Sequence, residues 1–97
     1  MDDTLRIAID GEIDHHRATR LREDFSLMLR DPDVHHMVID MRGVSMMDSS
    51  GIALMYGWYR QLEPRRGSIA LTHVPPVVAK VMRIGGLHTV MSVKEEA

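Results

Sequence analysis

The stretch that sets the fold is Met37-Val38-Ile39-Asp40-Met41, which the polar turn Met47-Asp48-Ser49-Ser50-Gly51 joins to the apolar run Ile52–Leu62. The first run is too short for a typical helix and rich in strand-forming residues. It therefore predicts a strand at the centre of a sheet, covered on both faces. In the last run apolar residues recur every three or four positions, which predicts a helix.

The same two periodicities extend to both ends of the chain. Alternation predicts strands, and spacings of three and four predict helices. The expected elements are a strand over Leu5–Ile9 that Gly11 ends, a helix that Asp14 is placed to cap and that has the apolar stripe Ala18, Leu21, Phe25 and Met28, a strand over Ser68–Leu71, a helix from Pro75-Pro76 to Gly85-Gly86, and a last strand over Thr89–Val93. Such alternation indicates a single α/β domain over residues 1–97, with helices packed against a mixed, mostly parallel sheet of about four strands.

Composition excludes several classes of function. The chain has 97 residues, a formal net charge of -2 and no cysteine. The weak negative charge gives no general attraction for nucleic acid or anionic lipid, and no stretch approaches the roughly 20 apolar residues of a membrane span. The lack of cysteine fits an intracellular protein. We therefore expect a cytoplasmic protein that has protein partners and binds neither nucleic acid nor membrane directly.

The polar turn places two hydroxyl groups at the start of a helix. There the first backbone N–H groups lack partners and the helix dipole is positive, so Asp48 is suited to capping and a phosphate group would be favoured. Ser49 is therefore the candidate switch residue, and Ser50 is the second choice. A plain N-cap is the alternative interpretation, because aspartate and serine are what helix starts prefer.

Two segments together resemble a known family. They are Gly11-Glu12-Ile13-Asp14-His15-His16, after the first strand, and Val44-Ser45-Met46-Met47-Asp48-Ser49-Ser50-Gly51, after the central one. They resemble the anti-sigma factor antagonists, whose fold is the STAS domain, and most closely the stage II sporulation protein AA type. The chain departs from that pattern at Arg42, where a small polar residue is expected, and at Pro75, where a serine cap is expected.

The resemblance implies a regulatory protein and not an enzyme. It implies that the chain binds an anti-sigma factor, itself a serine kinase, and so frees a sigma factor. The kinase would phosphorylate Ser49, and a PP2C-type phosphatase would reverse this. No cofactor or metal is expected, and the free protein is expected to be a monomer. The residues expected to contact the kinase are those of the two turns: Asp14, His15, His16, Asp48, Ser49, Ser50, Gly51 and Ile52. The alternative is a STAS-type interaction module of a larger signalling assembly, without a phosphoswitch.

Other patterns speak against catalysis. The six histidines lack the i, i+4 helical spacing of a zinc motif, and neither a serine-hydrolase elbow nor a glycine-rich nucleotide loop is present in the sequence. Gly57 favours close packing of the second helix at one point, and Trp58 is expected in the core or at its edge. The alternative for Trp58 is an exposed position, where it would extend the contact surface around the second helix.

Both polar turns follow strands. If these strands run parallel, their carboxyl ends meet at one edge of the sheet, where α/β domains tend to bind ligands, so Asp14 and Asp48 are expected in one site. A phosphate on Ser49 would add about -1.5 to -2 charges at a helix start, which the dipole favours, whereas burying an unpaired dianion at an interface is costly. The expected switch therefore acts on binding and leaves the fold intact.

Overall fold

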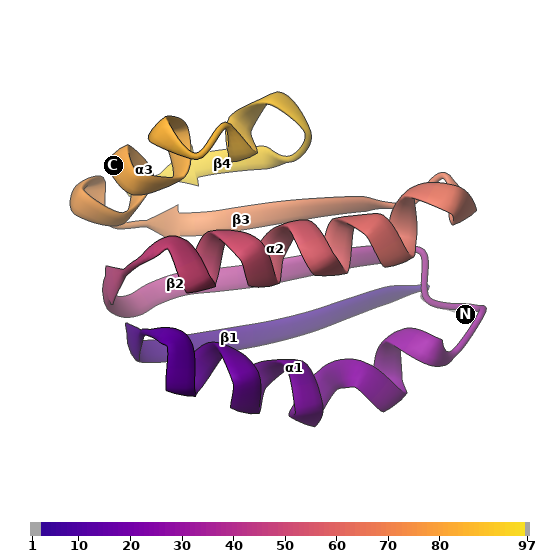
Figure 1. The fold of residues 1–97 in the computed structure, drawn as a ribbon. Helices are drawn as coiled ribbons and strands as arrows, with labels where there is room; N and C mark the ends of the chain where they lie inside the picture. Colours follow the sequence, from indigo (N-terminus) through magenta and orange to yellow (C-terminus); the bar gives the residue numbers. More distant parts are fainter. Residues whose placement is uncertain (1–2, 97) are drawn as a thin grey trace.

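The structure, a computed structural model, describes residues 3–96. Within this range the strands are β1 (Thr4–Ile13), β2 (His36–Met47), β3 (Ser68–Val74) and β4 (Ser92–Glu95). The helices are α1 (His15–Arg30), α2 (Ser49–Leu62), α3 (Pro76–Ile84) and the short 3-10 helices η1 (Glu63–Arg65) and η2 (Leu87–Thr89). The strands lie in the order β1-β2-β3-β4, and each neighbouring pair is parallel (Figure 1). The predicted α/β class is confirmed, and the described sheet is parallel throughout rather than mixed.

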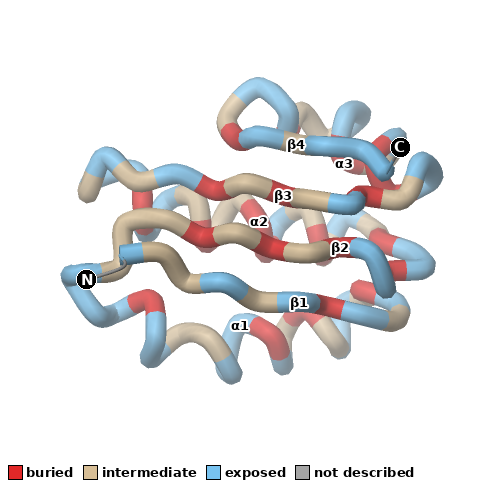
Figure 2. Tube along the Cα trace, turned by 180° about the vertical axis from the view of Figure 1, so that it is seen from behind, coloured by how far each residue is buried: buried red, intermediate tan, exposed pale blue. Residues whose placement is uncertain are grey.

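The α-helices of the described chain lie on one face of the sheet, and the other face is open (Figure 2). Burial in β2 alternates accordingly: Met37, Ile39 and Met41 are fully buried against the helices, whereas Val38 and Asp40 are only half-buried. The prediction that this strand is covered on both faces is therefore wrong. The polar Asp40 within the run is the residue that marks the open face.

β1, β2 and β3 are longer than the sequence predicted, and β4 is shifted along the chain. Gly11 does not end β1. It takes a left-handed conformation (φ 76°) that glycine adopts without steric cost, next to a register shift between Gly11 and Glu12, and the strand continues to Ile13. β2 runs for 12 residues with two register shifts against β1, so the polar turn shrinks to Asp48 alone. β4 starts at Ser92 and not at Thr89, because the preceding residues form η2.

The buried stripe of α1 also differs from the prediction in its last turn. Ala18 and Leu21 are buried and Phe25 is half-buried, as expected for the inner face. Met28 is 48% exposed, and Leu29 is fully buried in its place. A step of four residues after Phe25 keeps the stripe on the inner face, because the helix has 3.6 residues per turn.

Trp58 lies in the core, where its indole is 2% exposed. Its ring meets that of Phe25 edge to face, with centroids 6.1 Å apart and planes at 85°. This contact joins α1 to α2. The predicted close packing at Gly57 is wrong, because a Cβ atom added there would meet nothing within 4 Å.

Arg65 in η1 caps the C-terminal end of α1 through its side chain. Its guanidinium donates hydrogen bonds to the backbone carbonyl oxygens of Leu29 (2.7 Å), Val34 (2.8 Å) and Asp31 (3.0 Å). The last carbonyl groups of a helix have no partner within it, so this side chain supplies donors that the helix lacks. It also ties the end of α2 to the turn that leads into β2.

Candidate functional site

The two polar turns lie together at the carboxyl edge of the sheet. β1 and β2 end with Ile13 opposite Met47, so Asp14 and Asp48 leave the sheet from neighbouring positions. The backbone N–H of Asp48 donates to the carbonyl oxygen of Ile13 over 3.2 Å, which links the turns directly. The prediction that both turns share one edge is confirmed.

Each turn ends in an aspartate that caps the next helix. Asp14 Oδ1 accepts a hydrogen bond from the backbone N–H of Arg17 (2.9 Å), and Asp48 Oδ1 accepts one from the backbone N–H of Ser50 (2.8 Å). Both aspartates have extended backbone conformations, as N-cap residues do. Their predicted capping roles are confirmed, and both remain only half-buried at the surface.

Ser49 and Ser50 differ in accessibility. Ser49 is the first residue of α2 and is exposed, and within residues 3–96 its hydroxyl forms no hydrogen bond. Ser50 is half-buried, and its N–H is held by Asp48. Ser49 is therefore the more accessible of the two serines.

The other residues of the predicted site fall into two groups. His15 and His16 are exposed on the first turn of α1, and Ile52 is half-buried on the first turn of α2. Gly51 is buried instead. A Cβ atom there would lie 2.5 Å from Met47 Cγ and 3.1 Å from Ile13 Cγ2, so Gly51 lets the start of α2 approach the sheet closely.

Sequence reasoning missed the contribution of α3 to this edge. Gly85, which follows α3, lies against Ile52, and its carbonyl oxygen accepts a hydrogen bond from the Tyr56 hydroxyl over 2.9 Å. The adjoining Ile84 is 79% exposed, and Val77 at the start of α3 is 61% exposed. Their spacing of seven residues puts both on one face of the helix, a signal that the sequence already contained.

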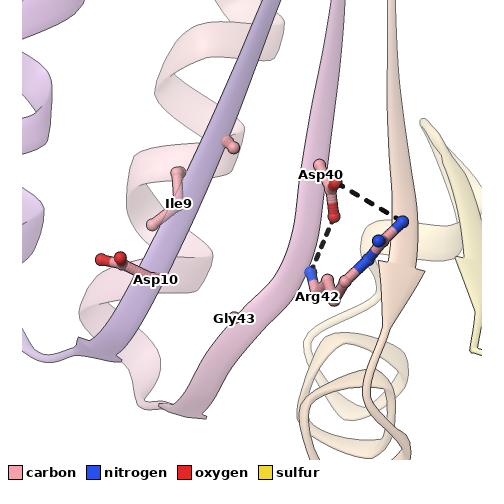
Figure 3. A pocket seen from close by; sticks show the side chains of 6 residues that line it. Ile9, Asp10, Asp40, Arg42 and Gly43 are labelled. Carbon is pink, nitrogen blue, oxygen red and sulfur yellow. Dashed lines mark hydrogen bonds and ion pairs between the residues drawn. The ribbon is translucent and has the colours of Figure 1, made fainter.

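A separate hollow of about 320 Å³ lies on the open face of the sheet, lined by Ala8, Ile9, Asp10, Asp40, Arg42 and Gly43 (Figure 3). Its polar groups are already paired. The Asp40 carboxylate accepts from the Arg42 backbone N–H (2.9 Å) and lies 3.9 Å from Arg42 Nη2 and 3.7 Å from His73 Nδ1. None of the predicted partner-binding residues lines this hollow.

Two kinds of feature are absent from the described residues. Residues 3–96 contain no group of three or more histidine, cysteine, aspartate or glutamate side chains placed to hold a metal ion. In the same range no helix has both the length and the apolar character needed to cross a bilayer.

Comparison with known proteins identifies relatives of this chain. The family model described as "Mlab, STAS domain" matches residues 1–93. An anti-sigma F factor antagonist from Lysinibacillus sphaericus is 34% identical over 85 residues, which cover 88% of this chain and 73% of that protein.

Two solved structures are similar in both sequence and fold. The anti-sigma factor antagonist SpoIIAA in its unphosphorylated form is 33% identical, with a TM-score of 0.82 over 93% of this chain and 78% of that one. The Bacillus cell fate determinant SpoIIAA in its phosphorylated form is 31% identical, with a TM-score of 0.74 over 96% of this chain and 84% of that one.

Proposed function

Since the chain belongs to the STAS-domain family, we propose that it is an anti-sigma factor antagonist that phosphorylation of Ser49 switches off. In this proposal the unphosphorylated protein binds an anti-sigma factor that is a serine kinase, and so frees a sigma factor. A PP2C-type phosphatase restores the active form. The protein is a substrate and a switch in the cytoplasm, is monomeric when free, and performs no catalysis of its own.

The observation that carries the proposal is the placement of Ser49. It is exposed at the first position of α2, and its neighbour Asp48 already caps the helix through Ser50, which leaves the Ser49 hydroxyl free. The similarity to SpoIIAA, whose structure is known in unphosphorylated and phosphorylated forms, supports the same assignment.

The electrostatics of this position favour a switch in binding. A phosphate at a helix N-terminus is stabilised by the dipole by roughly 0.3–1 kcal/mol per charge, so the fold tolerates it. At a desolvated interface the same dianion would lack a partner, and burying an unpaired charge costs several kcal/mol. Asp48 beside it adds like charge.

The proposed contact surface joins both turns to the end of α3. It contains Asp14, His15 and His16 from the first turn and Asp48 to Ile52 from the second. Gly51 is buried within this surface and lets α2 pack closely on the sheet. Ile84 extends this surface, because Gly85 lies against Ile52. An exposed apolar side chain next to exposed polar groups is typical of a protein–protein contact.

The assignment of Ser49 is tested by mass spectrometry after incubation with ATP and candidate anti-sigma factor kinases from the organism that carries the chain. One phosphate is expected, on Ser49. It should be lost in Ser49→Ala and kept in the matched variant Ser50→Ala. Phosphate retained by Ser49→Ala would disprove the assignment. Binding to a signalling assembly without any phosphorylation would favour the alternative, an interaction module without a switch.

The effect on binding is tested with Ser49→Asp. We expect this variant to bind the kinase about tenfold or more weakly, because a charge enters the interface, while its thermal unfolding stays nearly unchanged. Ser92→Asp is the matched control, since Ser92 is exposed at the start of β4. Calorimetric titration and thermal melting separate the two effects. A loss of stability in proportion to the loss of binding would refute a switch in binding.

A further inference from the structure

A groove runs between α1 and α2, which lie side by side on the covered face of the sheet (Figure 1). It has a volume of about 290 Å³, and we call it the α1–α2 groove. Its lining residues are Arg22, Ser26 and Arg30 from α1, and Leu54, Gly57, Trp58 and Gln61 from α2. None of them belongs to the surface proposed above for the kinase.

Arg22 and Arg30 are cations without partners. Within residues 3–96 neither forms an ion pair, and neither guanidinium donates a hydrogen bond. Arg6, Arg20, Arg60 and Arg66 are likewise without an ion pair among the described residues, but Arg22 and Arg30 are the two that line the groove. Arg22 and Arg30 stand about two helical turns apart, about 12 Å along the axis of α1.

The floor between the two arginines is apolar and hollow. Gly57 leaves open space where a side chain would stand, since nothing lies within 4 Å of its Cβ position. The Trp58 indole lines the groove beside it, and its Nε1 is a buried side-chain nitrogen with no acceptor in residues 3–96.

The size of the groove favours an amphipathic helix over a small molecule as its occupant. Small-molecule sites typically enclose about 300–1,000 Å³ and cover most of the ligand. The α1–α2 groove is at the lower limit of that range, and the two arginines on its α1 side stand about 12 Å apart. An amphipathic helix fits such a groove, with apolar side chains inserted and polar side chains at the rim.

We propose that the α1–α2 groove is a second docking site, which takes an amphipathic helix of a partner protein. An apolar side chain of that helix enters the hollow over Gly57, and acidic side chains two turns apart pair with Arg22 and Arg30. The site does not depend on the state of Ser49, because Gly57 lies eight residues further along α2, about 12 Å from the phosphorylated turn.

The probe for this proposal is a synthetic alanine-based helical peptide with two glutamates two turns apart and a leucine midway between them. Trp58 is the single tryptophan of the chain, so its emission reports directly on occupancy of the groove. We expect a saturable change in Trp58 emission with the full chain. Arg22→Glu and Arg30→Glu should each weaken binding about tenfold or more, and Gly57→Leu should block it by filling the hollow.

Three controls define the outcome. Arg20→Glu makes the same charge change on α1 outside the groove, and Ser49→Asp changes the other surface, so both should leave peptide affinity unchanged. A peptide with lysines in place of the glutamates should not bind. The proposal is overturned by equal affinity in the Arg22, Arg30 and Arg20 variants, or by no saturable change at millimolar peptide. It is also overturned if sedimentation shows that the wild-type chain self-associates and that Gly57→Leu abolishes this, since the occupant would then be a second copy.

Discussion

Two glycines of α2 should respond to alanine with opposite signs. Gly51 is packed on the sheet, and an added Cβ atom would lie 2.5 Å from Met47 Cγ, much closer than two carbon atoms approach. Gly57, six residues further on, has nothing within 4 Å of the same position. The pair therefore separates the helix propensity of alanine from the cost of overpacking within one element.

The magnitudes follow from these two surroundings. Gly57→Ala gains about 0.8–1 kcal/mol of unfolding free energy, because alanine is the better helix former and meets no obstacle. Gly51→Ala gains at most the same amount and loses about 1–3 kcal/mol to overpacking against Met47 and Ile13. The Gly51 variant should thus be less stable than the Gly57 variant by about 1–3 kcal/mol.

Urea denaturation and thermal melting followed by far-UV circular dichroism measure this difference. In a domain of this size 1 kcal/mol corresponds to about 4–8 °C, so the melting temperature of Gly51→Ala should be at least about 4 °C below that of Gly57→Ala. Equal stability of the two variants would refute the reasoning, because it would mean that the start of α2 can pack on the sheet without a glycine at position 51.

Two further predictions concern the ends of the helices. Asp14→Ala and Asp48→Ala should each lower the free energy of unfolding by about 0.5–2 kcal/mol in urea denaturation, because each removes a side-chain acceptor from a helix start; unchanged stability would show that the caps are dispensable. Arg65→Ala should cost about 1–3 kcal/mol, since it removes three hydrogen bonds to backbone carbonyl groups, whereas Arg60→Ala on the exposed face of α2 should stay within about 0.5 kcal/mol. Equal effects of the two arginine variants in the same assay would contradict this account of η1.

Local chemistry made the helix starts predictable from the sequence. Asp14 and Asp48 cap the helices that follow them because an aspartate side chain reaches the free N–H groups of the next turn whatever the rest of the chain does. The parallel pairing of β1 and β2, which brings both turns to one edge, follows from the alternation of strands and helices. That the edge binds a kinase remains a prediction.

The single-sided sheet depended on strand order, which the sequence pattern does not contain. Parallel strands joined by right-handed crossovers carry every helix to the same face when each strand is added beside the previous one. The order β1-β2-β3-β4 has no reversal, so the face that carries Asp40 stays open. An apolar run such as Met37–Met41 fits a central strand of either arrangement, which is why the expected cover on both faces was wrong.

Gly57 and Trp58 show a second limit of sequence reasoning. A glycine among aromatic residues fits both close packing and a hollow, and only the spacing between α1 and α2 decides which one occurs. In the last turn of α1 the buried residue is Leu29 and not Met28. Arg22, Ser26 and Arg30, which follow one another at steps of four residues, therefore line the groove. Contacts between elements thus produced a feature that no single segment indicated.

The proposed surfaces should work independently because of their separation along α2. A phosphate on Ser49 acts through charge, and at physiological ionic strength the field of an exposed charge is screened over about 8 Å. Gly57 is about 12 Å further along the helix, beyond that range. A change in packing could carry a signal further, but Ser49 is exposed and the dipole tolerates negative charge at its position, so the core beneath it has no reason to rearrange. The partner of the α1–α2 groove should therefore remain bound while the kinase is released.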